Sequence, residues 1–415
     1  MTSSEINHNT IVIFTSIFPF GNGEPFLETE INYLAERFEK VIIVTQNIED
    51  LKPRQVPANC EIKRIDLAVS GLEKIGAISG LFDSKFWKEH KIIKSVYNKK
   101  PNKAIISTML ISLFRAKKIA RYAKTLYRDN QQNSQLFFYS YWCDDVALGL
   151  AMFQKKHTEA FTLSRIHRWD VYFEESKFNY LPFRHYIANN IGKIFSISQD
   201  GIDYAVKNWK TDNNEKFVLS RLGINNSLTY EVSKNETCLI VSCSNLIPVK
   251  RVHLIGEALK EIEDIKIKWV HFGDGLEKKS LEIQIKGLPG NVEVELKGRV
   301  PNTEIYTYYN KNCPDLFINV SSSEGVPVSI MEAMSYGIPC VGTAVGGTPE
   351  IINKENGYLL SINPTADEVA SKIEKFQQLS IEDKTEKRKA AYSTWENKYN
   401  ADKNYNDFIE RINNL

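Results

Sequence analysis

The sequence predicts an α/β protein made of two doubly wound, parallel-sheet domains of similar size. Two observations lead to this fold class. Short apolar runs alternate along the chain with amphipathic stretches that are long enough to form crossover helices. The alternation stops in a polar run at residues 225–236 and then starts again, which indicates a linker there. The length of 415 residues also exceeds what one hydrophobic core usually serves.

The first domain is expected over residues 1–226. A strand at 11–14 leads through a glycine-containing loop into a helix whose apolar residues recur at a 3.6-residue spacing, and a strand at 41–45 follows. This order is the βαβ unit of a parallel sheet. Further strands are expected at residues 103–107, 135–141, 160–164, 193–198 and 216–219.

The second domain is expected over residues 227–392. Its predicted strands are residues 238–243, 268–272, 292–296, 316–320 and 340–343, with helices at 252–260, 276–285, 303–309 and 328–336. Residues 393–415 are helical with no strand after them, so we expect them to pack back on the first domain. Ligands of open parallel sheets bind beyond the carboxyl ends of the strands. Two such domains facing one another therefore predict a ligand cleft lined by the strand-to-helix loops.

Charge is segregated along the chain although the formal net charge is only +2. Residues 71–128 hold fourteen Lys and Arg against three acids, an excess of eleven that leaves the rest of the chain near −9. A patch of this kind predicts an anionic partner surface, either phospholipid headgroups or nucleic acid. A set of solvated helix faces is the alternative.

The cysteines and the N-terminus indicate where the protein works. None of the six cysteines has C-x-x-C spacing, so we expect reduced core residues in the cytosol and neither a zinc knuckle nor a redox pair. Residues 1–10 lack the pattern of a signal peptide, and the longest apolar stretch, 104–114, is far short of the ~20 residues of a membrane span. Export and membrane crossing are not expected.

Two loops of the first domain carry candidate ligand-binding groups. Gly21 and Gly23, followed by Glu24, precede a predicted helix, and this pattern lets backbone approach an anion. The dinucleotide fingerprint is absent because Phe26 occupies the position of its third glycine, and a turn that needs glycine for shape alone is the alternative. His167 follows the strand at 160–164 and is expected at the cleft, with a purely structural histidine as the alternative.

Metal chemistry has no sequence signal. The adjacent acids Asp144 and Asp145 are best interpreted as a pair at a helix N-terminus. No D-x-D occurs in the chain, so no divalent-cation site is predicted.

The second domain places two cations and two carboxylates after predicted strands. Lys250 and Arg251 precede a helix, where they would neutralise a diphosphate, although a solvated pair is the alternative. Glu324 lies in a loop, and Glu332 lies eight residues later among apolar neighbours. A buried carboxylate needs hydrogen-bond donors, and vicinal sugar hydroxyls would supply them. Alternatively, Glu332 pairs with a lysine and Glu324 caps the helix.

These motifs together resemble the retaining family 4 glycosyltransferases of the GT-B fold, the glycosyl transferases group 1. The resemblance covers residues 20–351, and its most specific element is the E-x7-E segment from Glu324 to Glu332. The later Gly346-Gly347-Thr-Pro-Glu350 supports it. The resemblance implies two Rossmann-like domains facing across a cleft, with a nucleotide-sugar donor bound mainly by the second.

The resemblance also implies roles for individual residues. Lys250 would bind the donor diphosphate, Glu324 the hydroxyls of the transferred sugar, and Glu332 the ribose. His167 would lie near the anomeric carbon, so that His167, Glu324 and Lys250 form the catalytic set. The other expected donor-binding residues are Gly21, Gly23 and Glu24 at the diphosphate, Gly273 in the glycine loop, Arg299 and Val300 along the base, and Gly325, Val326, Pro327 and Val328 near the sugar and phosphates.

One position departs from the family pattern. The family usually has an arginine about five residues before the lysine, and this chain has Asn245 there. Half of the expected phosphate charge is therefore missing at this position. Arg251 and Arg221 are the candidates to supply it.

The function implied by the resemblance is a retaining, metal-independent hexosyltransferase without a cofactor. It would move a sugar to a carbohydrate or lipid-linked acceptor in bacterial surface polysaccharide synthesis, in the cytoplasm, with its basic patch resting peripherally on the anionic inner membrane. Nucleic acid is not an expected partner. An epimerase or phosphorylase of the same fold and a non-catalytic sugar-nucleotide binder are the alternatives, and uridine and guanosine donors both fit.

Overall fold

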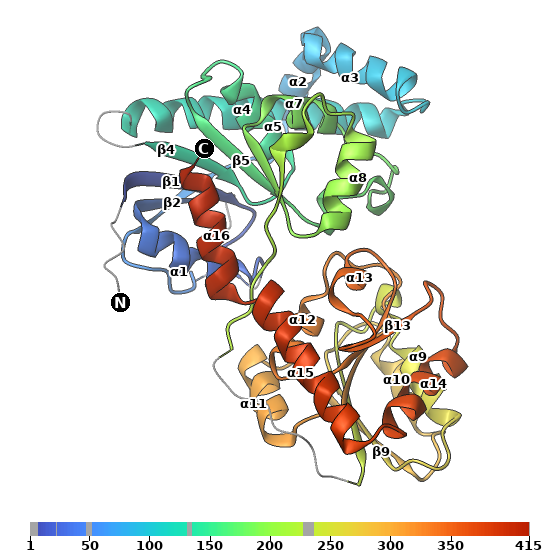
Figure 1. Cartoon of the computed structure of the whole chain (residues 1–415). Coiled ribbons are helices and arrows are strands. Elements are labelled where there is room, and N and C mark those ends of the chain that lie inside the picture. The colour runs from blue at the N-terminus through green and yellow to red at the C-terminus, as the bar shows by residue number, and fades with distance from the viewer. Residues whose placement is uncertain (1–6, 22, 47–51, 131–134, 227–235, 415) are drawn as a thin grey trace. The chain divides into compact units, whose positions relative to one another are not determined.

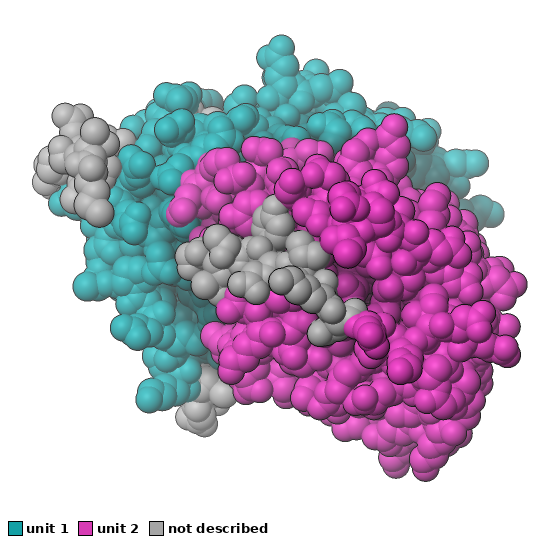
Figure 2. Space-filling view, turned by 60° about the horizontal axis from the view of Figure 1, so that its bottom comes forward, with its two compact units in different colours: residues 1–220, 405–415 teal, residues 221–404 magenta. Residues whose placement is uncertain are grey.

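The computed structural model describes residues 7–21, 23–46, 52–130, 135–226 and 236–414. The chain forms two compact units, coloured separately in Figure 2. Unit 1 comprises residues 1–220 and 405–415, and unit 2 comprises residues 221–404. Each unit contains a parallel sheet with packed helices (Figure 1), so the predicted α/β fold class is confirmed.

Unit 1 is built on a seven-stranded sheet in the order β3-β2-β1-β4-β5-β6-β7. Every neighbouring pair is parallel. Strands buried on both faces need apolar side chains throughout, which explains why the central ones are visible as apolar runs. The strands are β1 (Asn7–Thr15), β2 (Phe38–Gln46), β3 (Cys60–Ile65), β4 (Leu136–Ser140), β5 (Phe161–Ile166), β6 (Lys193–Ser196) and β7 (Phe217–Leu219).

The helices of unit 1 cover this sheet and bury its apolar faces. They are α1 (Leu27–Arg37), α2 (Leu72–Ile78), α3 (Ser84–Ser95), α4 (Lys103–Asn130), α5 (Asp145–Gln154), α6 (Arg168–Val171), α7 (Arg184–Asn190) and α8 (Gln199–Trp209). Short 3₁₀ turns are η1 (Ser79–Phe82), η2 (Phe173–Glu175) and η3 (Asn214–Lys216).

One sequence expectation for unit 1 is wrong, and one strand was not predicted. Residues 103–107 form the first turns of α4 and not a strand. Asn102 accepts a hydrogen bond from the backbone N–H of Ile105 at 2.9 Å, and the buried side chains of Ile105 and Met109 continue at helical spacing, so packing overrides the local β propensity. Strand β3 was not predicted because it is a half-buried edge strand with charged residues among its apolar ones.

Unit 2 is built on a six-stranded sheet in the order β10-β9-β8-β11-β12-β13. Its strands are β8 (Cys238–Cys243), β9 (Ile267–Phe272), β10 (Val292–Gly298), β11 (Leu316–Asn319), β12 (Cys340–Thr343) and β13 (Gly357–Leu360). Its helices are η4 (Pro248–Lys250), α9 (His253–Lys260), α10 (Lys278–Ile285), α11 (Asn302–Asn312), α12 (Val328–Ser335), α13 (Thr348–Ile351), α14 (Ala366–Gln377) and α15 (Ile381–Lys398). Each strand and helix predicted for this unit overlaps an observed one, whereas β13, α13, α14 and the first part of α15 are additional.

The C-terminal segment is two helices instead of one. Helix α15 contributes Trp395 to the core of unit 2, whereas α16 (Ala401–Asn413) buries Phe408 and Ile412 in the core of unit 1. The division between the units therefore falls after residues 220 and 404, where 226 and 392 were expected. Residues 227–235 of the expected linker lie outside the described part of the chain.

A buried ion pair joins α1, the sheet and α16 within unit 1. Glu30 of α1 and Arg165 of β5 are both fully buried, with 3.4 Å between Oε2 and Nη2. Tyr139 donates to Glu30 Oε1 at 3.0 Å, and the guanidinium of Arg165 lies 4.4 Å from the ring centroid of Phe408. Burial raises the pKa of Glu30, while Arg165 and Tyr139 oppose the rise. Removing one member of such a pair leaves an uncompensated buried charge.

We predict that Glu30→Gln lowers the free energy of unfolding by about 3–5 kcal/mol, because Arg165 stays charged in the core without a carboxylate. Urea unfolding of the full chain, followed by tryptophan fluorescence, measures the change. The exposed pair Lys40–Glu61, 2.6 Å apart, is the control, and Glu61→Gln should cost less than about 1 kcal/mol. Equal losses in the two variants would contradict the prediction.

Candidate functional site

Five loops of unit 2 meet at one edge of its sheet, because its strands are parallel and each loop leaves a carboxyl end. These loops follow β8, β9, β10, β11 and β12. Backbone hydrogen bonds connect them: Ser322 N donates to Val249 O at 2.8 Å, and Gly273 N donates to Gly298 O at 2.8 Å. The edge is therefore a backbone surface held in place before any ligand binds.

Two of the loops approach their neighbours so closely that only glycine fits. Gly273 has a φ of 143°, and a Cβ there would lie 1.8 Å from the carbonyl oxygen of Ser244. Gly346 has a φ of 49°, and a Cβ there would lie 1.9 Å from the carbonyl oxygen of Glu324. A side chain at Gly346 would displace the loop that carries Glu324.

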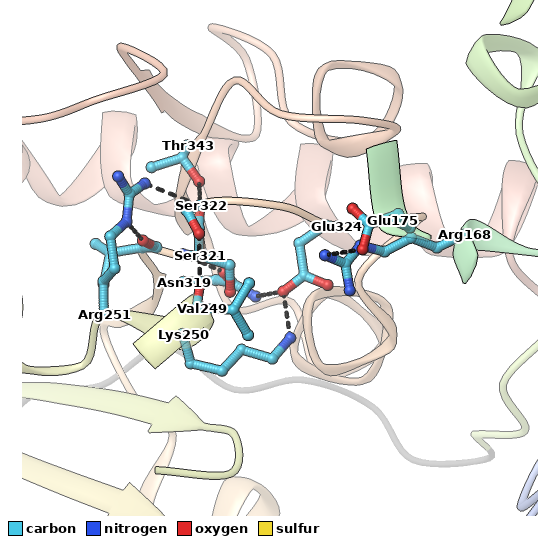
Figure 3. A network of polar contacts seen from close by, with 11 residues as sticks. Arg168, Glu175, Val249, Lys250, Arg251, Asn319, Ser321, Ser322, Glu324 and Thr343 are labelled. Atoms are coloured by element: carbon cyan, nitrogen blue, oxygen red, sulfur yellow. Dashed lines mark hydrogen bonds and ion pairs between the residues drawn. The ribbon is translucent and has the colours of Figure 1, made fainter. Parts of the chain in front are cut away.

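Glu324 and Lys250 form an ion pair at this edge (Figure 3). Glu324 Oε1 lies 2.6 Å from Lys250 Nζ and also accepts from Asn319 Nδ2 at 3.3 Å. The side chain of Lys250 is 23% exposed, and its ammonium has three N–H donors, so the pair remains open to a ligand. Helix α12 has Pro327 at its N-cap without a side-chain cap bond, so Glu324 does not cap it.

The neighbouring cation, Arg251, is used within the protein. Its backbone is left-handed, with a φ of 47°. Its guanidinium donates to the carbonyl oxygen of Ser321 at 3.0 Å (Figure 3) and to those of Val320 and Ile362 at 2.8 and 3.1 Å. These bonds join the loop after β11 to the segment after β13. Arg251 therefore has a structural role, and its expected contribution to neutralising a diphosphate stays a prediction.

Glu332 has no lysine partner among the described residues. It is 6% exposed in the second turn of α12 and accepts from Tyr306 Oη at 2.7 Å and from Asn302 Nδ2 at 3.3 Å, both in α11. Burial raises its pKa to about 7, and the Tyr306 hydrogen bond opposes the rise. A carboxyl group that titrates near neutrality in a loop-lined edge is a candidate ligand-binding group.

Asn245 and Arg299 lie together on the loops after β8 and β10. Arg299 Nη2 donates to Asn245 Oδ1 at 3.4 Å, and in the described part of the chain no carboxylate lies within ion-pair distance of this exposed guanidinium. Arg221, the other candidate for the missing charge, lies 3.3 Å from Glu350 Oε2. From the sequence, Arg299 was expected along the base of the donor. Its position after β10, two strands from β8, could have indicated that it lies near Asn245.

The remaining expected residues of unit 2 lie where the loops enter helices. Gly325, Val326, Pro327 and Val328 lead into α12, and Gly347 N donates to Gly325 O at 2.6 Å. Val300 packs beside the apolar core cluster that contains Tyr309. His271, which sequence reasoning missed, is buried beside Gly273, and its Nδ1 lies 2.9 Å from Ser242 Oγ. Burial lowers the pKa of His271 to about 4, so it is neutral.

In unit 1, His167 lies directly after β5 and is 7% exposed. Its ring packs against Tyr141 and Trp142, with centroid distances of 4.9 and 4.4 Å. Among the described residues neither ring nitrogen has a hydrogen-bond partner. Burial, aided by the charge of Arg165, holds its pKa well below the usual range. His167 is thus a neutral imidazole with unused hydrogen-bonding capacity, which is uncommon for a buried polar group.

The glycine loop of unit 1 is closed on itself by Glu24. The carboxylate accepts from the backbone N–H groups of Ser16, Ile17 and Phe18 at 2.7, 2.9 and 2.7 Å, and from Trp142 Nε1 at 2.6 Å. The Glu24 carboxylate is thus used within unit 1, and a contact between the backbone of this loop and a diphosphate stays a prediction. Gly21 has a φ of 58°, and a Cβ at Gly23 would lie 2.3 Å from Ile17 Cδ1, so both positions favour glycine. Residue 22 lies outside the described residues.

The adjacent acids at the start of α5 have structural partners. Asp144 is the N-cap of α5 and accepts from Val146 N at 2.8 Å, as expected, while Asp145 pairs with Arg115 at 3.2 Å. In the described ranges no three His, Cys, Asp or Glu side chains gather as metal ligands do. Within the same ranges, no helix combines the length and the apolarity that crossing a bilayer requires.

Among known protein families, the model of Glycosyl transferases group 1 matches residues 230–394, so this part of the chain is similar to that family. N-acetyl-alpha-D-glucosaminyl L-malate synthase of Bacillus anthracis is 33% identical over 138 residues, 33% of this chain and 35% of that protein. TuaC of Bacillus subtilis (strain 168), assigned by name to teichuronic acid biosynthesis, is 29% identical over 45% of this chain and 46% of its own length. The chain matches less than half the length of these relatives.

Solved structures show the same fold over nearly the whole chain. Sucrose-phosphate synthase from Thermosynechococcus elongatus superposes with a TM-score of 0.69 at 14% identity, covering 98% of this chain and 99% of that one. HepE from Anabaena, solved with UDP-glucose, gives 0.63 at 15% identity over 98% and 100%. The fold is GT-B, as the resemblance implied.

We predict that Glu332→Gln changes the pH dependence of stability. The folded protein keeps this proton up to about pH 7, whereas the unfolded chain releases it near pH 4.5, so the free energy of unfolding falls as pH rises between those values. The loss amounts to about 3 kcal/mol and is absent in the glutamine variant. We therefore expect urea unfolding to show that the free energy of unfolding of Glu332→Gln, relative to that of the wild type, is higher at pH 8 than at pH 5.

The exposed Glu355 provides the control for this measurement, because its side chain is 55% exposed. Glu355→Gln should differ from the wild type by the same amount at both pH values. A Glu332→Gln variant whose difference from the wild type is independent of pH would show that Glu332 is ionised in the folded protein at pH 5.

Proposed function

We propose that this protein is a glycosyltransferase that moves a sugar from a nucleotide-sugar donor to a carbohydrate or lipid-linked acceptor. The observation that carries the proposal is the pair of carboxylates, Glu324 and Glu332, at the loop edge of the group 1 domain. One has a lysine at 2.6 Å and the other is held by neutral donors. The two groups therefore suit the two chemically different ends of an activated sugar.

The donor's sugar end suits Glu324 and Lys250. The ammonium offers N–H donors and positive charge to a diphosphate, while the carboxylate accepts from sugar hydroxyls. The backbone N–H groups at the start of α12, around Gly325, add further donors for phosphate oxygens. The nucleoside end suits Glu332, because a ribose presents two vicinal hydroxyl donors to a carboxylate that is otherwise buried.

The reaction we propose is retaining and independent of metal. The bond between the anomeric carbon and the phosphate oxygen breaks, and its electron pair passes to the diphosphate. The acceptor hydroxyl attacks from the same face, and its proton passes to the departing phosphate oxygen. Lys250 and Arg299 stabilise the charge that develops on the leaving group. His167, neutral and with both ring nitrogens unused among the described residues, suits a hydrogen bond to a hydroxyl near the reacting carbon.

The relatives guide the choice of donor and biological role. HepE was solved with UDP-glucose, and the GtfA subunit of Streptococcus parasanguinis, 26% identical over 48% of this chain and 40% of its own length, is named for UDP-N-acetylglucosamine. We therefore propose a uridine donor, tested first with these two sugars and with GDP-mannose for the guanosine alternative. TuaC is named for teichuronic acid, which supports a role in surface polysaccharide synthesis.

Lys250→Ala should lower kcat/KM by about 100- to 1000-fold, because the leaving diphosphate loses its nearest cation. Turnover is followed as nucleotide release, and mass spectrometry with and without acceptor separates transfer from epimerisation and phosphorolysis. Lys354→Ala is the matched control, since that lysine is 91% exposed in the same unit, and it should retain full activity. NMR of the product reports whether the anomeric configuration is retained. Equal activities in the two variants would argue against the site.

Arg299→Ala should weaken UDP binding about tenfold and leave uridine binding unchanged, because a charge-assisted bond to the diphosphate is lost. Isothermal titration with the two ligands gives both affinities. Arg221→Ala tests the competing candidate and should change neither, since Glu350 already holds that guanidinium. A loss confined to Arg221→Ala, with Arg299→Ala like the wild type, would reverse the assignment.

A further inference from the structure

A surface of unit 1 exposes apolar side chains in an unusual concentration. Five of the ten large apolar side chains that are exposed in the described part of the chain fall between residues 75 and 96. Helix α2 exposes Ile75 and Ile78, η1 ends in Phe82, which is 92% exposed, and α3 exposes Trp87. We call residues 72–95 the α2–α3 surface. In Figure 1 its helices lie on the outer side of α4.

The same surface carries lysines without acid partners. Trp87, Lys91 and Lys94 recur at the i, i+4, i+7 spacing of one helix face, and all three are exposed, with Lys88 alongside. No carboxylate in the described residues pairs with Lys88, Lys91 or Lys94. The three acids of the surrounding basic patch are already used: Glu73 pairs with Lys118 at 2.8 Å, Asp83 with Lys117 at 2.8 Å, and Glu89 is buried under Tyr180.

The positive charge continues into a cavity of about 1380 Å³ between α3, α4, α5 and α7. Three acids and seven Lys and Arg side chains line it, and the basic ones include Lys88, Arg121 and Lys124. Its lining residues Lys155 and Lys156 precede β5, whereas His167 follows the opposite end of that strand. The cavity therefore lies away from the candidate catalytic histidine and needs a separate explanation.

We propose that the α2–α3 surface docks unit 1 on an anionic phospholipid bilayer. Helices that expose apolar and basic side chains on one face bind at the boundary between headgroups and acyl chains. Ile75, Ile78 and Phe82 enter that boundary, while the lysines of α3 and the adjoining cavity hold headgroup phosphates. Ile75 and Ile78 favour a bilayer over nucleic acid, because aliphatic side chains gain by leaving water for acyl chains and have no aromatic face on which a base can stack, although Phe82 and Trp87 have one.

Docking of this kind needs no sugar transfer, so its failure and the failure of the proposed function are distinguishable. The test is sedimentation of the full chain with phosphatidylcholine vesicles, with and without phosphatidylglycerol. Binding should require phosphatidylglycerol and should weaken as salt is raised, because the interaction is partly electrostatic. Equal binding to both kinds of vesicle, or none to either, would overturn the proposal.

Charge reversal of the three lysines, Lys88→Glu, Lys91→Glu and Lys94→Glu together, should lower vesicle partitioning by about 100-fold or more. The matched control reverses three exposed lysines of unit 2, Lys266, Lys279 and Lys286, to glutamate. It should bind vesicles like the wild type. Equal losses in the two triple variants would show that only net charge matters and would overturn the assignment of this surface.

The apolar contribution is tested separately by Phe82→Ser, which should lower partitioning about tenfold. Leu276→Ser is its control, since Leu276 is 90% exposed in unit 2, and it should have no effect. Both side chains are exposed, so thermal unfolding should match the wild type in each variant. Phe82→Ser binding vesicles like the wild type would overturn the insertion of this apolar side chain. Salt-sensitive binding to oligonucleotides by a chain that ignores vesicles would overturn the bilayer as the partner.

Discussion

Close backbone approach at the carboxyl edge of the unit 2 sheet is the constraint on which the candidate site depends. The loop after β9 lies against Ser244, and the loop after β12 lies against Glu324, at separations that leave no room for a Cβ. This packing brings the end of η4 and the loop after β11 within reach, so that Lys250 and Glu324 meet at 2.6 Å. Arg251 secures the arrangement by donating to Val320 and Ser321. The two neighbouring cations thus have different roles. Lys250 lies at the edge beside Glu324, and Arg251 holds the loop after β11 in place.

The two carboxylates of the site differ in their surroundings although both are nearly buried. Glu324 has a cation beside it and an amide from Asn319. Glu332 has only the neutral donors Tyr306 and Asn302, and burial raises its pKa to about 7. A ligand that brings hydroxyl donors to Glu332 would relieve the cost of burying its charge. The same ligand needs negative charge at its other end to engage Lys250. A sugar nucleotide satisfies both requirements in one molecule.

How much could be predicted from the sequence depended on how local each interaction is. The alternation of strands and helices in unit 2, Glu332 in its helix and the Asp144 cap rest on neighbouring residues, and they were predicted. The fates of Arg251 and Glu24 depend on distant partners, Ile362 in one case and Trp142 in the other. The strand expected at residues 103–107 failed for a similar reason, because the burial of α4 outweighed its β-branched start. The position of a residue after a strand predicts where its backbone lies in the fold. It does not predict which group its side chain will bind.

The buried pair in unit 1 connects the stability of the fold with the chemistry of its candidate catalytic residue. Arg165 lies two positions before His167 on the way out of β5, and both are buried. Glu30 and the ring of Phe408 hold the guanidinium in the core, which fixes α16 and keeps a positive charge near the imidazole. That charge and the loss of water both disfavour the imidazolium. The neutral His167 is therefore a property of the whole core, so substitutions at Glu30 or Arg165 act on its protonation as well as on the packing of α16.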